Sequence, residues 1–328
     1  MYQRKKWLLL GLLFVMVMFN LTGWYGEVQC QPKYPTRAID IIVPFTPGGA
    51  TDLVIRAMAV YLKQKWSVPV NVINKPGGNT VPACLEVHRA APDGYILLGD
   101  NNPSSSMLPI VVKSLPFKVM DRTFIGMVAG SPAVIIVPSG SQVKSLKDLE
   151  VEIKKDPENF TWASLGGTGL PDYVTRQFLK TIGVDVLRTK PVMCQGGAQA
   201  VVLTAGGHIK MGSGTVSAST PAITGNTITP LAITSKTRWP DLPNLPTAAE
   251  AGYPTVNYLY WVGFSGPPNL PPDIIDKWDK TLQEILADPE VISKLKNIGA
   301  IPFYQNARGN RKYVMEEIEE ASKLWGLK

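Results

Sequence analysis

The sequence predicts an α/β fold of two lobes around a ligand cleft, and three observations support this prediction. Apolar strands alternate with helices through residues 39–99, a rhythm typical of a parallel sheet covered by helices. The same alternation returns through residues 133–234. In each of these parts a glycine-rich turn ends a strand and opens a helix, at 47–49 and at 166–169.

The first part contains the clearest pattern of the chain. Its apolar strand stops at Pro44 and passes through Pro47, Gly48 and Gly49 into a segment with apolar residues at helical spacing. The expected elements are strands at 39–45, 68–74 and 95–99, and helices at 50–66 and 82–91. Ligands of parallel sheets bind at the carboxyl ends of the strands, so we expect the glycine turn to lie at the site.

The later elements follow from the same signals. Ser145, with Asp148 at the third position, predicts a helix start. The expected elements are strands at 133–137, 160–164, 184–192, 208–214, 229–234 and 301–303, and helices at 145–155, 171–182, 197–205, 272–286, 290–298 and 308–324. We expect lobe 1 at residues 31–125 and 253–328, lobe 2 at 126–252, and hinge crossings between them.

Composition and charge exclude two classes of protein. An apolar content of 45% with 9% aromatic residues predicts a packed core rather than disorder. The net charge is +7, but the basic residues cluster only at Arg4, Lys5 and Lys6. No stretch combines clustered cations with aromatic residues, as a nucleic-acid surface would. We therefore expect no nucleic-acid partner.

Residues 1–30 have the pattern of an export signal. The basic cluster precedes an apolar run at 7–19, which is shorter than the roughly 20 residues of a spanning helix. No clean cleavage site follows, so an uncleaved membrane anchor remains an alternative. Cys30 lacks the small residues that precede a lipidated cysteine. With either processing we expect a periplasmic or other extracytoplasmic location.

The chain offers few groups for catalysis. His88 and His208 are its 2 histidines, and neither has a partner motif. No nucleophile elbow with a usable histidine, phosphate-binding loop, dinucleotide fingerprint or metal-ligand spacing occurs. Cys84 and Cys194 could form a disulfide in an oxidising compartment, but buried free thiols are favoured. We therefore expect no catalytic residue, no metal and no cofactor.

The two glycine turns favour a binding function. A helix N-terminus presents free backbone N–H groups and the positive end of the helix dipole, which suit a carboxylate. Two such turns facing each other across a cleft could hold both ends of a small dianion. Glycines at such turns also serve tight packing alone, but an export signal without a catalyst favours binding.

The order of short motifs resembles the extracytoplasmic receptors of tripartite tricarboxylate transporters. The matching blocks are Tyr34-Pro-Thr-Arg37, Ile41-Ile-Val-Pro-Phe-Thr-Pro-Gly-Gly49 with Asp52, Asn74-Lys-Pro-Gly77, Ala91-Pro-Asp-Gly-Tyr-Ile-Leu-Leu98, Leu115-Pro-Phe117, Leu231-Ala-Ile-Thr-Ser235 with Arg238, Pro243-Asn-Leu-Pro-Thr247, Glu250-Ala-Gly252 and Trp261-Val-Gly-Phe-Ser-Gly-Pro267. Each block is short, but they run in family order to the C-terminus. The resemblance implies the type II periplasmic binding-protein fold and a receptor rather than an enzyme.

The resemblance also implies which residues bind the ligand. The first glycine turn would hold one carboxylate through backbone N–H groups and ordered water, and the second would grip the opposite end. The implied set is Phe45, Thr46, Pro47, Gly48, Gly49, Asp52, Ser164, Gly166, Gly167, Thr168, Gly169, Gly196, Gly197, Ala198 and Ser213. Asp52 would orient a polar group or a bridging water; its other interpretation is an acid placed favourably in the first turn of a helix.

Two departures from the family pattern bear on the ligand. Many relatives carry a histidine shortly after the second glycine turn, where this chain has Asp172 or Tyr173. They also extend the Asn-x-Pro-Gly motif with glycines, where this chain has Asn79 after Gly78. If Asp172 faces the cleft, it disfavours a third carboxylate by like-charge repulsion. A mono- or dicarboxylate, or an acid bearing an amine, is then expected rather than citrate.

The implied function is that of a monomeric receptor. It would capture a small carboxylate and deliver it to the membrane permease subunits of a tripartite transporter. An alternative is that the same lobes present the ligand to a sensor kinase. A third alternative, an enzyme with Asp52 or Asp172 as base, lacks a nucleophile motif and supporting histidines.

Overall fold

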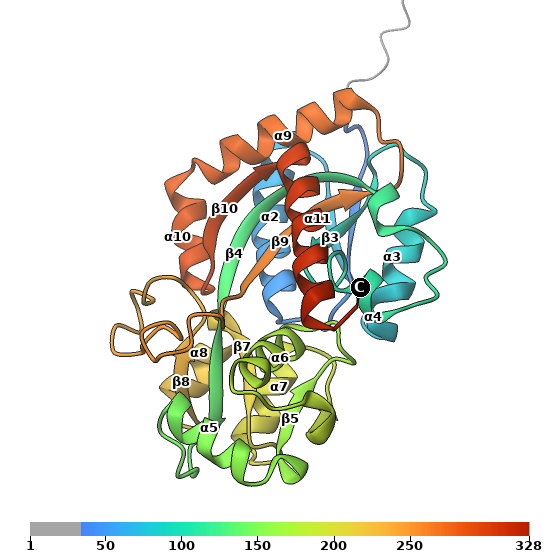
Figure 1. The fold of residues 1–328 in the computed structure, drawn as a ribbon. Helices are drawn as coiled ribbons and strands as arrows, with labels where there is room; N and C mark the ends of the chain where they lie inside the picture. The colour runs from blue at the N-terminus through green and yellow to red at the C-terminus, as the bar shows by residue number, and fades with distance from the viewer. Residues whose placement is uncertain (1–33, 328) are drawn as a thin grey trace, which may run out of the picture. The chain divides into compact units, whose positions relative to one another are not determined.

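One long strand, β4 (Thr123–Pro138), runs through both lobes of the protein (Figure 1). The structure is a computed structural model that describes residues 34–327, and the chain from Arg37 onward forms one compact unit. Up to Pro132, β4 pairs with strands of lobe 1, and from Ala133 it pairs with strands of lobe 2. The predicted α/β fold of two lobes is confirmed.

Lobe 1 is built on a mixed sheet in the order β10-β4-β9-β3-β1-β2. Strand β1 pairs in parallel with β2 and β3, as predicted, because a helix links each strand to the next. In contrast, β9 runs antiparallel to β3 and β4, and β10 runs antiparallel to β4. The strands are β1 (Ile39–Val43), β2 (Val70–Asn74), β3 (Ile96–Asn101), β9 (Leu259–Gly266) and β10 (Ile301–Asn306).

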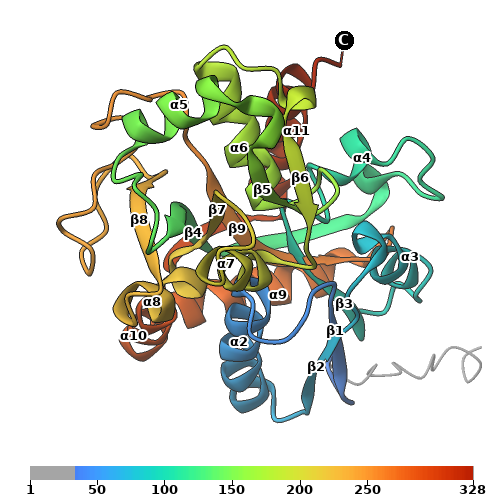
Figure 2. The same ribbon diagram turned by 90° about the horizontal axis from the view of Figure 1, so that it is seen from below.

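Helices cover both faces of this sheet, with α2 on one face and α11 on the other (Figure 1, Figure 2). The helices are α2 (Ala50–Trp66), α3 (Val81–His88), α4 (Leu108–Val111), α9 (Pro272–Leu286), α10 (Pro289–Asn297) and α11 (Ala307–Leu324). Between α11 and the sheet lies a core that includes Ile42, Leu98, Trp261 and Val314. Burial of these apolar side chains stabilises the lobe and fixes the end of β1, where the first glycine turn begins.

Lobe 2 carries a smaller sheet and its own core. Here β4 pairs antiparallel with β7 and β8, while β5 and β6 form a separate parallel pair. The elements are β5 (Thr161–Ser164), β6 (Lys190–Met193), β7 (Gly212–Thr215), β8 (Ile228–Ile233), α5 (Leu146–Lys155), α6 (Leu170–Thr181), α7 (Gly197–Ala205) and α8 (Val216–Thr224). Val134, Val201 and Trp239 belong to the core of lobe 2.

Short 3₁₀ turns occur in both lobes. They lie at Gly78–Thr80, Val119–Asp121, Pro157–Asn159 and Val186–Arg188.

Several elements differ from the sequence prediction. β4 begins at Thr123 rather than at residue 133, and neither β9 nor α8 is among the predicted elements. Glycines weaken the strand signal of β4, yet they are needed where backbones approach closely. A Cβ at Gly126 would lie 2.9 Å from the carbonyl oxygen of Gln305. The predicted lobe boundaries at 125 and 252 remain predictions.

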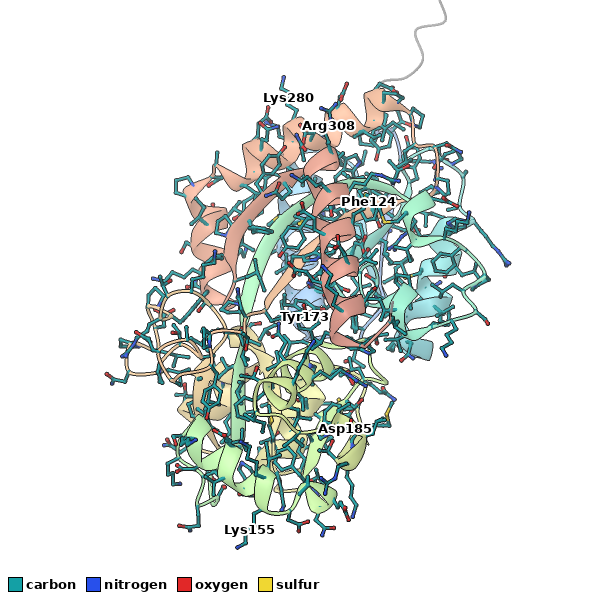
Figure 3. All side chains as sticks on the ribbon, viewed as in Figure 1. Phe124, Lys155, Tyr173, Asp185, Lys280 and Arg308 are labelled. Carbon is teal, nitrogen blue, oxygen red and sulfur yellow. The ribbon has the colours of Figure 1, made fainter. Side chains whose placement is uncertain are left out.

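The last helix connects the two lobes. Trp325 follows α11, and its ring centroid lies 5.8 Å from that of Tyr173. Tyr173 belongs to α6 of lobe 2 and is labelled in Figure 3. The predicted export segment at 1–30, including Cys30, lies outside the described residues. Between residues 34 and 327, no helix is both long enough and apolar enough to cross a membrane.

Candidate functional site

The turn between β1 and α2 is organised around the carboxylate of Asp52. This side chain is buried and accepts hydrogen bonds from the backbone N–H of Gly48 and from Nε of Arg56, each at 2.9 Å. Nδ2 of Asn74 donates to Asp52 at 2.9 Å and to the carbonyl oxygen of Phe45 at 3.0 Å. Burial raises the pKa of Asp52, but these hydrogen bonds outweigh it and hold the pKa below its ordinary value. Asp52 therefore shapes the turn.

The second glycine turn is organised in the same way by Asp172. Its buried carboxylate accepts hydrogen bonds from Oγ of Ser164 at 2.5 Å and from the backbone N–H of Leu165 at 2.8 Å. The N–H groups of Gly167 and Gly169 donate to it at 3.0 and 3.1 Å. The four donors favour the charged form of Asp172, but burial outweighs them and holds its pKa above the ordinary value. This turn already holds an internal carboxylate.

These contacts show that Asp172 does not repel a third carboxylate on the ligand. The repulsion expected of Asp172 requires that its carboxylate face the cleft, whereas the carboxylate points into its own turn and is 1% exposed. Its charge is balanced by local donors, so it gives no reason to disfavour citrate. The sequence shows the acid beside the glycines but not which groups it accepts from.

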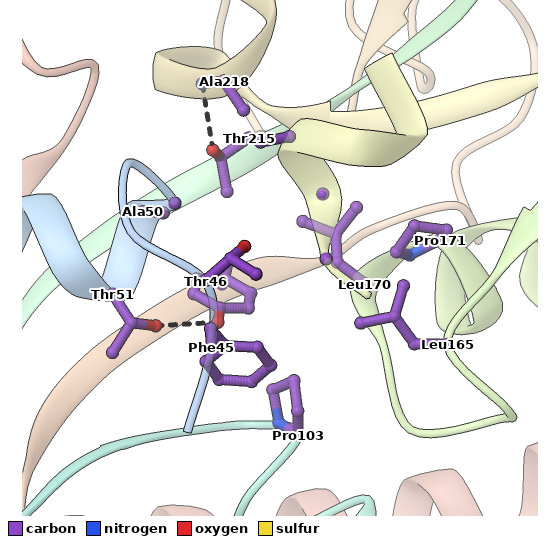
Figure 4. A pocket seen from close by; sticks show the side chains of 15 residues that line it. Phe45, Thr46, Ala50, Thr51, Pro103, Leu165, Leu170, Pro171, Thr215 and Ala218 are labelled. Carbon is purple, nitrogen blue, oxygen red and sulfur yellow. Dashed lines mark hydrogen bonds between the residues drawn. The ribbon is translucent and has the colours of Figure 1, made fainter. Parts of the chain in front are cut away.

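A small cavity, which we call the inner chamber, lies where α2, α6, α7 and α8 begin (Figure 4). Its volume is about 40 Å³. The lining residues are Phe45, Thr46, Gly49, Ala50, Thr51, Pro103, Leu165, Leu170, Pro171, Gly196, Gly197, Ala198, Thr215, Ala218 and Tyr260. One water needs at least ~10–15 Å³, so the chamber suits a carboxylate group or a few waters.

No charged side chain is among the lining residues of the inner chamber, so attraction for an anion there would come from backbone and hydroxyl groups. The first N–H groups of a helix have no acceptor within that helix, and the helix dipole is positive there. Gly49 and Ala50 place the start of α2 at the chamber, and Gly197 and Ala198 place the start of α7 there. An anion in this position would be held by two helix N-termini.

Hydroxyl groups add a polar edge to the inner chamber. The hydroxyls of Thr51 and Tyr260 lie 2.9 Å apart, and Nδ2 of Asn101 donates to Oγ1 of Thr51 at 2.8 Å. Burial raises the pKa of Tyr260, so its hydroxyl stays protonated at neutral pH. Tyr260 is not in the predicted set; its position directly before the Trp261 family block is the one sequence signal for it.

A second cavity, which we call the outer chamber, adjoins the inner one and has a volume of about 330 Å³. The two chambers share Phe45 and Leu165 as lining residues. The other residues that line the outer chamber are Pro44, Gly77, Gly78, Asn79, Thr80, Thr168, Met193, Cys194, Gln195 and Gln199. Segments from both lobes therefore contribute to each chamber.

The structure brings only part of the predicted ligand-binding set to these chambers. Phe45, Thr46, Gly49, Gly196, Gly197 and Ala198 line the inner chamber, and Thr168 lines the outer one. Pro47, Gly48 and Asp52 belong to the first turn without lining a chamber. Ser164, Gly167 and Gly169 donate to Asp172, and the N–H of Gly166 donates to Oγ of Ser164. Ser213 is buried in β7. Of the residues that line the inner chamber, the sequence did not indicate Ala50, Thr51, Pro103, Leu170, Pro171, Thr215, Ala218 or Tyr260.

Close contacts between the lobes depend on glycines beside the chambers. A Cβ at Gly166 of lobe 2 would lie 3.0 Å from Oδ1 of Asn79 in lobe 1, and a Cβ at Gly299 of lobe 1 would lie 2.4 Å from the backbone nitrogen of Ser217 in lobe 2. Gly166 and Gly299 have φ of +72° and +68°, a region that favours glycine. The described arrangement is thus one in which the lobes are in contact.

Neither histidine lines a chamber, and of the two described cysteines Cys194 lines the outer one. Cys84 and Cys194 are free and buried, as favoured from the sequence, and burial raises the pKa of each thiol to about 11. The His88 ring stacks on Phe117 with centroids 5.2 Å apart, and His208 is exposed. Within residues 34–327, no group of three or more His, Cys, Asp and Glu residues is placed to hold a metal ion.

Two lobes joined by a continuous strand, with an uncharged cavity between helix N-termini, define a solute-binding receptor. The chain matches the family described as the tripartite tricarboxylate transporter family receptor over residues 54–325, and it belongs to that family. The family predicted from the motif order is thereby confirmed. Receptors of this family are periplasmic.

Individual relatives agree with this assignment. Protein BugT of Bordetella pertussis is 29% identical over 314 residues, which cover 94% of each chain. The structure of the periplasmic binding protein BugD has a TM-score of 0.82 at 28% identity and covers 89% of this chain and 98% of that one. A structure of an R. palustris protein with adipate has a TM-score of 0.83 at 27% identity and covers 89% and 97%. The predicted periplasmic binding-protein fold is confirmed.

Proposed function

We propose that this protein captures a small carboxylate in the inner chamber and delivers it to the membrane subunits of a tripartite transporter. The observation that supports the proposal most is the convergence of α2 and α7, through their N-termini, on a cavity of about 40 Å³ without charged lining residues. A carboxylate fits this volume and receives charge-assisted hydrogen bonds from N–H groups. The adipate in the R. palustris relative supports the same class of ligand.

Each part of the inner chamber has a distinct role in this proposal. Backbone N–H groups of Ala50 and Ala198 donate to the carboxylate oxygens, and the Tyr260 hydroxyl orients the ligand or a bridging water. Phe45 and Leu165 exclude bulk water, which strengthens the hydrogen bonds to the anion. Asp52 contributes indirectly, because its contact with the N–H of Gly48 fixes the turn that precedes α2.

We propose binding without turnover of the ligand. The inner chamber is lined by no Asp, Glu, His, Lys or Cys residue, so no general base or activated nucleophile faces a bound acid. Delivery by a monomer to permease subunits is the proposed route, and presentation to a sensor kinase is the alternative. Co-purification with either class of membrane protein distinguishes the two.

A thermal-shift assay on the full chain tests the proposal. The chain is unfolded, dialysed and refolded to remove co-purified ligand and then mixed with a panel of carboxylates. An acid at one hundred times its dissociation constant adds about 2.7 kcal/mol of stability. Ala198→Leu fills the inner chamber and should abolish the shift, whereas Val202→Leu, on the exposed side of the same helix, should retain it. Absence of a shift with every acid contradicts the proposal.

A further inference from the structure

We propose that the outer chamber binds the far end of the carboxylate ligand, and that this far end is an uncharged group that both donates and accepts hydrogen bonds, such as a carboxamide. The inference rests on the proposed function, because it places a carboxylate in the inner chamber. It adds a second subsite and the chemical class of ligand that the two subsites select together.

The sizes and shared lining of the chambers indicate an elongated ligand. The inner chamber, at about 40 Å³, accommodates a carboxylate and little more, whereas the outer chamber has about 330 Å³. Phe45 and Leu165 line both chambers, so a ligand that extends from one into the other passes between two apolar side chains. A chain of methylene groups suits that passage, because it loses no hydrogen bond to water there.

The chemistry of the outer chamber disfavours a second charge. Its lining residues include no Lys, Arg, His, Asp or Glu. The cations of the neighbouring segments are already paired, Arg56 with Asp52 at 2.9 Å and Lys75 with Glu86 at 2.5 Å. A second carboxylate would therefore lose hydration without gaining a cationic partner. An uncharged polar group avoids that loss.

Three residues with primary amides, Asn79, Gln195 and Gln199, line this chamber from both lobes, and the two glutamines are also exposed to solvent. Oε1 of Gln199 accepts from the backbone N–H of Gln195 at 2.7 Å, which leaves Nε2 of Gln199 free to donate. Among the hydrogen bonds of residues 34–327, the side-chain amides of Asn79 and Gln195 have no partner. A ligand amide can donate to and accept from such groups at once. Because Asn79 belongs to lobe 1 and both glutamines to lobe 2, a bound amide would bridge the lobes.

The backbone of the lobe 1 side supports a role in ligand binding. Gly77, Gly78, Asn79 and Thr80 all have positive φ, at +106°, +55°, +50° and +67°. A β-branched residue such as Thr80 is strongly disfavoured in this region. Strain of this kind is concentrated at binding sites, where the surrounding structure imposes it. In this chain the strained segment places Asn79 at the chamber. Many relatives of the family pattern carry a glycine at the corresponding position.

Calorimetric titration of the full, ligand-freed chain tests the inference. The ligands are built on succinic, adipic and suberic frameworks, each offered as the diacid, the monoamide and the unsubstituted monocarboxylate. We expect the monoamide of at least one framework to bind tenfold or more tightly than both matched compounds. Gln199→Leu should lower the affinity for that monoamide at least tenfold. Gln64→Leu, at the exposed far end of α2, should leave it unchanged.

Two further results keep the inference separate from the proposed function. If Gln199→Leu does not fold, Asn79→Leu, on the opposite side of the chamber, should lower the same affinity. If acids bind, but in every framework the diacid binds as tightly as its monoamide or more tightly, the inference is overturned and the proposed function stays intact. Failure of every acid to bind would overturn both.

Discussion

Gly299 of lobe 1 and Ser217 of lobe 2 approach so closely that a Cβ at position 299 would lie 2.4 Å from the Ser217 backbone nitrogen. The carbonyl oxygen of Gly299 also accepts a hydrogen bond of 2.7 Å from Oγ of Ser131, which lies on β4 one residue before Pro132. Ser217 belongs to the first turn of α8, between the inner-chamber residues Thr215 and Ala218. This contact between the lobes therefore lies directly beside the inner chamber.

Gly299→Ala should separate the lobes and weaken ligand binding. The added methyl group clashes with backbone rather than with a movable side chain, so the closed arrangement becomes less favourable. We expect the affinity for a carboxylate identified by the panel to fall roughly tenfold, equivalent to about 1.4 kcal/mol. Calorimetry measures the affinity, and small-angle X-ray scattering of the liganded protein measures the separation.

Gly207→Ala is the matched control. Gly207 has φ of +69°, close to that of Gly299, but a Cβ there meets nothing within 4 Å. Gly207→Ala should lose roughly 1–2 kcal/mol of stability, because alanine is strained at positive φ, and Gly299→Ala should lose more because of its added clash with the Ser217 backbone. Only Gly299→Ala should lose affinity. Equal affinities in the two variants would show that the Gly299–Ser217 contact has no role in closure.

Asp52→Asn should destabilise the protein and change its response to acid. The variant loses charge-assisted hydrogen bonds from Arg56 and the Gly48 N–H, an expected loss of about 1–3 kcal/mol. Because the folded-state pKa of Asp52 lies below its ordinary value of 3.8, its stabilising effect is complete above that pH and is lost as the pH falls through the folded-state pKa.

Urea unfolding at pH 6 and in the acid range down to pH 3 measures this effect. The stability difference between the wild type and Asp52→Asn should be largest at pH 6 and should shrink on acidification. Asp148→Asn gives a comparison of the same sign, because the backbone N–H of Lys144 also lowers the pKa of this exposed acid in another first helical turn. A difference that is independent of pH would mean that the Asp52 charge does not stabilise the turn.

Glu317 is expected to give the opposite dependence on pH. This buried carboxyl of α11 accepts from Nε1 of Trp261 at 3.0 Å and from the side chains of Asn102 and Ser106. Burial raises its pKa from 4.5 to about 7 despite these donors. The folded state therefore holds an extra proton between these values, so stability should fall as the pH rises from 5 to 8, by roughly 3 kcal/mol.

Glu317→Gln removes the titrating group while keeping its size. Its stability should be nearly constant between pH 5 and pH 8 in urea unfolding experiments, whereas the wild type and Glu316→Gln, an exposed position on the same helix, should both lose stability. The charged or titratable neighbours of Glu317 are Glu320, Tyr173, Tyr258 and Tyr313. The same decline in Glu317→Gln would assign the effect to other groups.

Local sequence patterns were sufficient where one short segment decides the structure. The apolar run of β1, Gly48 and the helical spacing after Ala50 predicted the first turn, because each signal acts within a few residues. The same holds for Gly197 at the start of α7. Together with the motif order, these segments were enough for the fold and for 6 of the 15 residues that line the inner chamber.

Other features depend on contacts between distant segments. Helix α8 contains Pro221 and several Ser and Thr residues, which are weak helix formers, and tertiary packing overrides that preference. Asp172 lies beside the second glycine turn in the sequence, but only the folded chain shows that the turn's N–H groups donate to it. The outer chamber combines Asn79 with Gln199, which no local pattern relates.

The most direct test of the central claim compares an acid with its own amide in the inner chamber. Each acid that binds the full chain is titrated calorimetrically beside the derivative in which every carboxylate has become a primary amide. Hydrogen bonds to a charged group contribute about 1.5–3 kcal/mol each, so the fully amidated compound should bind at least tenfold more weakly. Equal affinity for the acid and its amide would contradict a carboxylate site formed by the helix N-termini.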